Sequence, residues 1–269
     1  MYNDIYPVQP FLMTNTTTYY KMKMQNSPIV HFYAFEAETM QENSITTVPD
    51  GCVDLLFQIS GDRADGYAYG TVTKSRTLDV SDGSSYFGVR FKPGYLPKNI
   101  DVSLPELVDN HISLRDVKGG GVLTDSVAEA GGFSERIDIM LRFIGEDWRQ
   151  GDLLQMLIAN IERYNGNMRV SALEEETHYS ARYLNKVFRQ QFGLPPKVFS
   201  NIIRFQTMLR KINEGRGGSV ANLAAEFGYY DQSHMIKEFK EFAAVTPKEY
   251  FSAVDLPNYG KQIVTINNA

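Results

Sequence analysis

The C-terminal part of the chain contains an internal repeat, and this repeat limits the folds that the chain can adopt. At a shift of 51 positions, residues 179–199 align with residues 230–250, and the lysines, phenylalanines and prolines of the two segments coincide. Upstream, at a shift of 50 positions, residues 170–179 align with residues 220–229. The one-residue difference falls where a turn is expected, and surface connections tolerate insertions. A duplicated segment of this length predicts two copies of one supersecondary unit.

Each copy has the pattern of a short helix, a tight turn and a longer helix. Apolar residues recur on one face of the longer helices: Leu184, Val187 and Phe188 in the first copy, and Met235, Phe239 and Phe242 in the second. Cationic and polar residues recur on the other face at i, i+4 and i+7: Arg182, Lys186 and Arg189, then Ser233, Lys237 and Lys240. The pattern predicts two helix-turn-helix units joined by a helix over residues 197–215.

A basic stripe on one amphipathic helix is most often only a solvated face. The fold requires only the apolar face of each copy to be repeated. Because the basic stripe is repeated at the same offset as well, it favours a partner-binding surface shared by both copies. A helix in the major groove of DNA needs an anchored apolar face and an exposed face with cations for phosphates and hydrogen-bonding groups for base edges. We therefore interpret the two stripes as a DNA-binding surface.

The first 150 residues have a different character from the repeat. Strand-like runs alternate with turn residues, and apolar residues alternate with polar ones in residues 52–59 and 86–91, which predicts half-buried strands. The net charge of −5 divides into −7 for residues 1–151 and +2 for the remainder. We expect an α+β chain: an antiparallel sheet or barrel-like domain with helices over residues 1–150, a helical module over 151–252, and a C-terminal tail without a strong signal over 253–269.

Local signals predict helices around the sheet. Ser103 and Glu106 have capping-box spacing, which predicts a short helix directly after Ser103. A helical stripe predicts a longer helix over residues 134–150: Ile137, Leu141, Ile144 and Trp148. A further apolar stripe predicts a helix that begins near Asp152 and ends at residues 165–166.

At the repeated segments the sequence resembles the AraC/XylS family of bacterial transcription regulators. "LAAEFGYYDQSHMIKEFKEFAAVTPKEY" resembles the second helix-turn-helix signature of that family, and "YLNKVFRQQFGLPPKVFSNIIRF" resembles the first. In the N-terminal half, "VPDGCVDLLFQI", "YGTVTKSRT" and "FGVRFKPGYLP" resemble the sensory domain of one AraC subgroup. The resemblance covers most of the chain and implies a sensory, and also dimerising, domain followed by a double helix-turn-helix DNA-binding domain.

By position, the resemblance implies two sets of DNA-contacting residues. Base contacts are implied for Arg182, Asn185, Lys186, Gln232, Ser233 and Lys237. Positions nearer the phosphate backbone are implied for Tyr183, Arg189, His234 and Lys240. It also implies a small-molecule effector in the N-terminal domain, and aromatic residues of the strands are the candidate effector-binding residues, with ordinary core packing as the alternative: Tyr33, Phe35, Phe57, Tyr67, Tyr69 and Phe87.

Three positions depart from the family pattern. Glu174 and His178 stand where the first unit usually has alanine and a turn glycine, and Ala244 replaces a glycine in the second unit. A residue other than glycine in a left-handed turn costs about 1 kcal/mol, so we expect strain in the first turn. We also expect the acidic run over residues 174–176 to repel phosphate if it faces DNA.

Other chemistry receives little support from the sequence. The four histidines, His31, His111, His178 and His234, lack metal-ligand spacing, and neither a phosphate-binding loop nor a nucleophile elbow is found. We therefore predict no cofactor, no metal site and no enzymatic activity. We expect Cys52, the single cysteine, to be an inert core residue because neighbouring acidic residues raise its pKa. A redox sensor that acts through Cys52 is the alternative.

These observations predict a sequence-specific DNA-binding transcription regulator controlled by a small-molecule effector. The expected partners are double-stranded DNA, an unidentified effector, RNA polymerase and a second copy in a homodimer, with no membrane. The N-terminus lacks the features of a signal peptide, so we expect a cytoplasmic protein. The alternative is a ligand-binding or enzymatic N-terminal domain attached to a helical protein-interaction module. The sequence leaves open whether transcription rises or falls.

Overall fold

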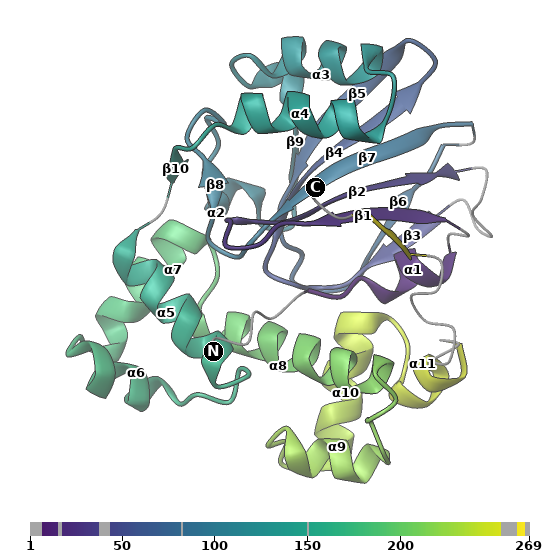
Figure 1. Cartoon of the computed structure of the whole chain (residues 1–269). Coiled ribbons are helices and arrows are strands. Elements are labelled where there is room, and N and C mark those ends of the chain that lie inside the picture. The colour runs from purple at the N-terminus through teal and green to yellow at the C-terminus, as the bar shows by residue number, and fades with distance from the viewer. Residues whose placement is uncertain are drawn as a thin grey trace.

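The computed structural model describes residues 7–15, 18–37, 44–81, 83–149, 151–253 and 263–266. In these residues an N-terminal domain built on a β-sheet lies against a C-terminal helical module, and α8 (Pro196–Asn213), the long helix of that module, runs along the side that faces the sheet domain (Figure 1). The predicted α+β class, with the sheet domain preceding an all-α module, is confirmed. None of the described helices has the length and apolar character that crossing a bilayer requires.

The main sheet of the described residues has seven strands in the order β11-β1-β2-β7-β4-β5-β9. Their bounds in this order are Ile263–Thr265, Tyr19–Lys23, Ile29–Glu36, Ser85–Phe91, Val53–Ser60, Arg63–Tyr69 and His111–Ser113. Neighbouring strands are antiparallel except β1 and β11, which are parallel. Two smaller ladders pair β3 (Ser44–Thr47) with β6 (Arg76–Asp79), and β8 (Leu96–Pro97) with β10 (Trp148–Arg149).

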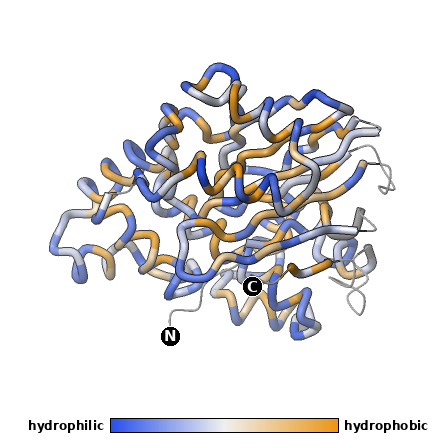
Figure 2. The backbone as a smooth tube through the Cα atoms, turned by 45° about the horizontal axis from the view of Figure 1, so that its top comes forward, coloured by the Kyte–Doolittle hydropathy of each residue, from blue (hydrophilic) through white to orange (hydrophobic). Residues whose placement is uncertain are grey.

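The two faces of the sheet pack against different partners, which follows from the alternation of side chains along a strand. One face carries the main N-terminal core and is covered by α3 (Gly120–Glu129) and α4 (Phe133–Ile144) (Figure 1). The other face lies toward α1 (Pro10–Asn15) and the β3–β6 ladder, with a smaller aromatic cluster beneath them. Figure 2 shows apolar stretches along the strands and alternation of apolar and hydrophilic positions along the helices.

Residues 151–253, all of which the structure describes, form seven helices. The central one is α8. The other six are α5 (Asp152–Arg163), α6 (Val170–Thr177), α7 (Ala181–Phe192), α9 (Val220–Glu226), α10 (Gln232–Ala243) and α11 (Pro247–Ala253). Helices α6 and α7 form the first predicted unit, and α9 and α10 form the second, with α8 as the connecting helix. The apolar sides of all four meet in one core with α8. The repeat therefore predicted the elements of this module correctly.

Two segments differ from the sequence-based expectation. The helix predicted over residues 134–150 ends at Ile144, because Gly145 adopts a positive φ of 64° and breaks it. Trp148 belongs instead to β10, and its ring packs edge-on against Phe91 at 5.7 Å. In the predicted tail, Ile263–Thr265 form strand β11 beside β1. The short helix α2 (Leu104–Leu107) does follow Ser103, whose backbone N–H donates to Glu106 at 2.9 Å.

Candidate functional site

Helix α7 presents the first set of predicted DNA-contacting residues. The Ser180 hydroxyl accepts a hydrogen bond from the Tyr183 backbone N–H at 3.3 Å and caps the helix, which ends at Gly193. The apolar stripe is buried: Leu184, Val187 and Phe188. Four predicted contacts are exposed: Arg182, Tyr183, Lys186 and Arg189. Asn185 is half-buried, and its amide donates to the Ala181 carbonyl at 2.9 Å, so its own helix already engages one of its donors.

Helix α10 presents the second set in the same way. Its cap is Asp231, whose carboxylate accepts from the His234 backbone N–H at 2.7 Å. Its apolar stripe is buried: Met235, Phe239 and Phe242. All five predicted contacts are exposed: Gln232, Ser233, His234, Lys237 and Lys240. Nine of the ten predicted DNA-contacting side chains are therefore exposed on two similarly anchored helices.

A buried polar network fixes α10 to α8. Arg204 of α8 forms an ion pair with Glu238 of α10 at 2.8 Å, and both side chains are less than 10% exposed. The Tyr229 hydroxyl donates to Glu238 at 2.6 Å, and the Arg204 guanidinium lies over the Tyr229 ring at 4.2 Å. Burial and the Glu238 carboxylate raise the pKa of Tyr229, which therefore remains a hydrogen-bond donor. The sequence analysis missed this network, although Glu238 lies three positions after Met235, on the inward side of the helix.

Two of the three departures from the family pattern, His178 and Ala244, lie in left-handed turns, whereas Glu174 lies within α6. His178, at the end of α6, has φ 57°, and the equivalent position of the second unit is Gly228 with φ 68°. Ala244, at the end of α10, has φ 62°, and the equivalent position of the first unit is Gly193 with φ 89°. Each unit thus has one glycine and one side-chain-bearing residue at its two left-handed positions.

The acidic run before α7 has a structural role that the sequence did not indicate. Glu174 accepts a hydrogen bond from the backbone N–H of Ala181 at 2.5 Å. This N–H belongs to the first turn of α7, where backbone donors lack partners within the helix. Glu174 therefore stabilises the start of α7, while Glu175 and Glu176 are exposed.

The N-terminal domain contains a cavity of about 80 Å³ on the face of the sheet opposite α3 and α4. Of the six candidate effector residues, three line it: Tyr33, Phe35 and Tyr69. Tyr67 lies beside Tyr69, with ring centroids 6.0 Å apart, but is not part of the lining. Phe57 and Phe87 are fully buried in the core on the opposite face, because residues at odd and even positions of a strand point to opposite sides. We therefore remove Phe57 and Phe87 from the candidate set.

A charged cluster forms one wall of this cavity. The Arg90 guanidinium contacts Asp54 at 2.8 Å and Asp50 at 3.0 Å. The Tyr33 hydroxyl donates to Asp54 at 3.0 Å, and its ring lies so close over Gly88 that a side chain at that position would collide with it. Burial alone would lower the pKa of Arg90, but the two carboxylates raise it well above its usual value, so Arg90 stays charged.

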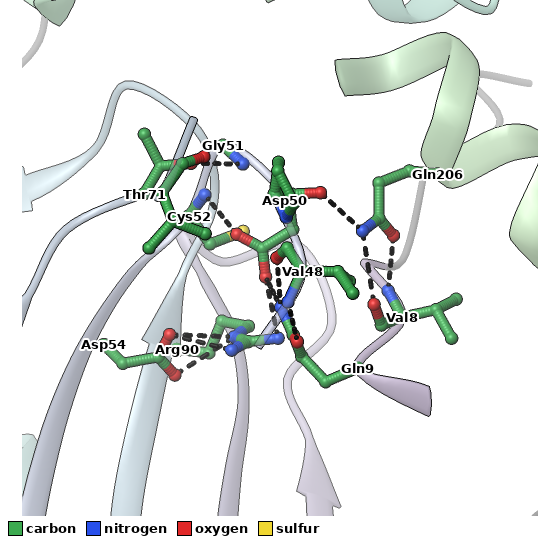
Figure 3. A network of polar contacts seen from close by, with 12 residues as sticks. Val8, Gln9, Val48, Asp50, Gly51, Cys52, Asp54, Thr71, Arg90 and Gln206 are labelled. Carbon is green, nitrogen blue, oxygen red and sulfur yellow. Dashed lines mark hydrogen bonds and ion pairs between the residues drawn. The ribbon is translucent and has the colours of Figure 1, made fainter. Parts of the chain in front are cut away.

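Loop 48–51 connects this cluster to the helical module (Figure 3). Asp50 accepts hydrogen bonds from the Gln9 amide at 2.8 Å and from the Cys52 backbone N–H at 2.9 Å. From the other side, Gln206 of α8 donates to the Pro49 carbonyl at 2.8 Å. The Gln206 amide also exchanges two hydrogen bonds with the Val8 backbone, at 2.7 and 3.2 Å. Asp50, which lines the cavity, is thus separated from α8 only by the neighbouring Pro49 and one hydrogen bond.

Sequence reasoning did not find this connection. Its residues are separated by up to 198 positions, and a glutamine on a helix carries no signal of a distant partner. In the sequence analysis, Asp50 and Asp54 were considered only as the acidic neighbours expected to raise the pKa of Cys52. Cys52 itself is buried, and its pKa is raised first by burial and only then by Asp50, so the expected core position is confirmed while its inertness stays a prediction. These surroundings do not favour the redox alternative, which needs an accessible thiolate.

The comparisons with known proteins agree with this architecture. Residues 173–253 match the family model described as "Helix-turn-helix domain", and residues 26–113 match "Domain of unknown function (DUF6597)". An uncharacterized HTH-type transcriptional regulator of Haemophilus influenzae is 27% identical over 100 residues, which are 37% of this chain and 33% of the relative. The chain thus matches about a third of the length of that relative.

Solved structures show weaker similarity. The apo form of a ToxT variant from Vibrio cholerae is 14% identical, with a TM-score of 0.45 over 86% of this chain and all of that chain. The C-terminal domain of AraT, a response regulator from Geobacillus stearothermophilus, is 18% identical, with a TM-score of 0.36 over 39% of this chain and 87% of that chain.

Together, the fold and the sequence matches define a class: a double helix-turn-helix protein with an N-terminal β-domain. The helical module matches a helix-turn-helix domain model, and the resemblance inferred from the repeated segments is confirmed. Residues 26–113 of the N-terminal domain match a family model of unknown function.

Proposed function

We propose that the protein is a sequence-specific DNA-binding transcription regulator that acts in the cytoplasm. The observation that supports this proposal is the exposed stripe on each of two equivalent helices, α7 and α10, held on a common buried frame. In each stripe, cations lie beside side chains with hydrogen-bonding tips, as reading bases through a phosphate-lined groove requires.

In the proposed complex each recognition helix enters the major groove. Arg182 and Lys186 of α7, and Gln232 and Lys237 of α10, face the base edges. Arg189 and Lys240, one to two turns further along their helices, lie near phosphates. Two such helices on one module contact successive major-groove segments, about 34 Å apart along the DNA. Helix α7 reads bases less strongly than α10, because one donor of Asn185 is engaged within its own helix.

We further propose that a small molecule in the N-terminal cavity controls DNA binding. The cavity adjoins loop 48–51, and this loop contacts α8 through Pro49 and Gln206. The segment before β6 also touches α10 directly, because the Ser75 N–H donates to the Glu241 carbonyl at 3.3 Å. A ligand that displaces these loops would change how α8 and α10 are supported, and with them the relative placement of the two recognition helices.

The proposal is tested by selecting DNA ligands from a random duplex library with the full-length protein. We expect one enriched motif with two half-sites about one helical turn apart. Affinity for this motif should fall with salt, with a slope of about −0.9 per neutralised phosphate on a logarithmic plot. Reversal of Lys237 and Lys240 to Glu should abolish binding, whereas Lys248→Glu, an exposed lysine outside the stripes, should weaken it only slightly. Failure to enrich any motif would contradict the proposal.

A further inference from the structure

A polar cleft of about 300 Å³ lies in the helical module and shares no lining residue with the cavity of the N-terminal domain. Its wall is formed by the connection between α5 and α6, by the second half of α8 and by the end of α9. The cleft therefore lies where the two helix-turn-helix units meet across α8. Three cations and two carboxylates are among the residues that line it: Arg210, Lys211, Arg216, Glu214 and Glu226.

The two carboxylates leave one of the three cations unmatched. Lys211 forms an ion pair with Glu226, and Arg216 forms one with Glu214. Arg210 is half-buried, and among the described residues its guanidinium has neither an ion pair nor a hydrogen-bond partner. Burial and the charge of Arg216 lower the pKa of Arg210, as expected for a cation without a compensating anion. Because arginine stays protonated in proteins, the cleft carries one positive charge in excess.

Two asparagines add uncharged donors to the same cleft: Asn165 and Asn167. Both are exposed, and within the part of the chain that the structure describes their side-chain amides have no hydrogen-bond partner. The turn that carries them is fixed on α8. Gly166 lies between them, so close to the helix that a Cβ there would be 2.1 Å from the Ser200 carbonyl oxygen. The cleft thus has free donors from two segments, the α5–α6 turn and α8.

We infer that Arg210, Asn165 and Asn167 form a binding site for a phosphate group. A guanidinium donates two parallel hydrogen bonds to a phosphate, and charge-assisted hydrogen bonds of this kind are strong. The asparagine amides supply donors for the remaining phosphate oxygens. A carboxylate suits the cleft less well, because the guanidinium alone would engage both of its oxygens and leave the amides unused.

The DNA backbone is the phosphate source that the position of the cleft favours, and this part of the inference rests on the proposed function. The cleft borders the turn that leads into α10, because Phe227 lines it and a Cβ at Gly228 would lie 3.5 Å from the Asn167 Oδ1 atom. Between two successive major-groove segments the sugar-phosphate backbone passes the module, and phosphate contacts of arginine and asparagine set the register of a protein on DNA. The other source is a free phosphorylated molecule, and the test has one arm for each.

The first arm measures phosphate binding without DNA. Full-length protein is titrated with inorganic phosphate at neutral pH and constant ionic strength, and the melting temperature and the arginine Nε–H signals in ¹⁵N spectra are recorded. We expect saturable stabilisation and a shift of the Arg210 signal. Arg210→Met should weaken this binding roughly tenfold or more, because it removes the charge-assisted hydrogen bonds. Arg142→Met removes the same charge from an exposed position of α4 and should leave the dissociation constant within about twofold, because solvent and salt screen a distant charge.

The second arm measures affinity for the DNA motif selected from the random library, at several salt concentrations. Arg210→Met should lower the magnitude of the logarithmic salt slope by about 0.9, the contribution of one phosphate, and leave base preference unchanged. Arg210→Lys keeps the charge and should retain the slope with reduced affinity, because it lacks the planar fork. An uncharged methylphosphonate at one position between the half-sites should weaken binding of the wild type but not of Arg210→Met.

The two arms distinguish the sources of phosphate. Arg210→Met keeps an apolar stem and deletes an unmatched cation, so without phosphate it should melt no lower than the wild type. An effect on the DNA motif alone assigns the site to the DNA backbone, an effect on free phosphate alone assigns it to a phosphorylated molecule, and effects in both arms mean that the two compete. The inference is overturned if Arg210→Met behaves as Arg142→Met in both arms. If the wild type enriches no motif, the proposed function fails, and the first arm alone decides whether the cleft binds phosphate.

Discussion

At the scale of single residues, the two helix-turn-helix units differ in how they form their left-handed turns. Ala244 adopts φ 62° where the first unit has Gly193. We predict that Ala244→Gly raises the free energy of unfolding by up to about 1 kcal/mol, because glycine removes the cost of a Cβ in this conformation. The gain is reduced by the greater freedom of glycine in the unfolded chain. Urea denaturation measures the difference, and a lower stability of the variant would contradict this explanation.

The reverse substitution, Gly193→Ala, should lower the free energy of unfolding by more than the conformational cost alone. A Cβ there would lie 2.6 Å from Val108 and 2.8 Å from Pro105, in the segment around α2 that packs on the end of α7. Gly215 also has a positive φ, of 72°, but a Cβ at that position meets open space. Gly193→Ala should therefore destabilise the protein more than Gly215→Ala in the same urea titrations. Equal losses would show that the contact with α2 is unimportant.

The pH dependence of stability provides a second test at this scale. The pKa of Lys21 is about 8 in the folded protein and 10.5 in an ordinary setting. Between these values the unfolded chain binds more protons than the folded one, so stability should rise as the pH increases from about 8 to 10.5. Lys21→Met should remove this contribution, as seen in chemical denaturation across the pH range. An unchanged profile would mean that Lys21 is well solvated.

At the scale of elements, the sequence predicted what is repeated or periodic and missed what depends on distant pairing. Both copies of the repeat carry the same apolar spacing, so α6, α7, α9 and α10 could be placed. Strands β10 and β11 have two and three residues, too few for a periodic signal, and they exist because β8 and β1 offer them an edge. Trp148 was included in the predicted helix because its spacing fits the apolar stripe, although Gly145 ends that helix before Trp148.

Helix α10 carries two acidic residues, the buried Glu238 and the exposed Glu241, and we predict that their removal has different effects on stability. Glu238→Ala leaves Arg204 buried without its carboxylate, and breaking a buried ion pair in this way costs about 3–5 kcal/mol. Glu241, also in α10, forms an exposed ion pair with Lys74 of the N-terminal domain. Glu241→Ala removes this pair and should lower the free energy of unfolding by less than about 1 kcal/mol. Thermal unfolding of both variants compares the two. Similar losses would show that the Arg204 network does not hold the helix.

At the scale of the whole molecule, contacts between the domains decide whether the cavity can influence the recognition helices. The sequence does not predict these contacts, because Gln9, Asp50 and Gln206 meet their partners only in the folded chain. The same limit applies to the candidate site: the exposed stripes followed from helical spacing, but the choice among aromatic residues required knowing which face of the sheet each one occupies.

Gln206→Ala tests the connection between the domains. It removes the hydrogen bonds to Val8 and Pro49 and leaves their backbone groups unpaired, at a cost of about 1–3 kcal/mol. We expect faster hydrogen exchange in residues 7–15 and 48–52, with little change inside the sheet. Gln191→Ala, at an exposed glutamine of α7, is the control and should leave exchange in these segments unchanged. Unaltered protection in Gln206→Ala would show that the domains are held together elsewhere.

The central claim is that two equivalent helices read DNA together, and the most direct test measures the affinity of three variants for the selected operator. Arg182→Ala and Lys237→Ala should each weaken binding by about 1–3 kcal/mol and relax base preference in different half-sites, one helical turn apart. Lys248→Ala should bind nearly as well as the wild type. If Arg182→Ala and Lys237→Ala bind as Lys248→Ala does, with base preference intact in both half-sites, the two stripes are only solvated helix faces.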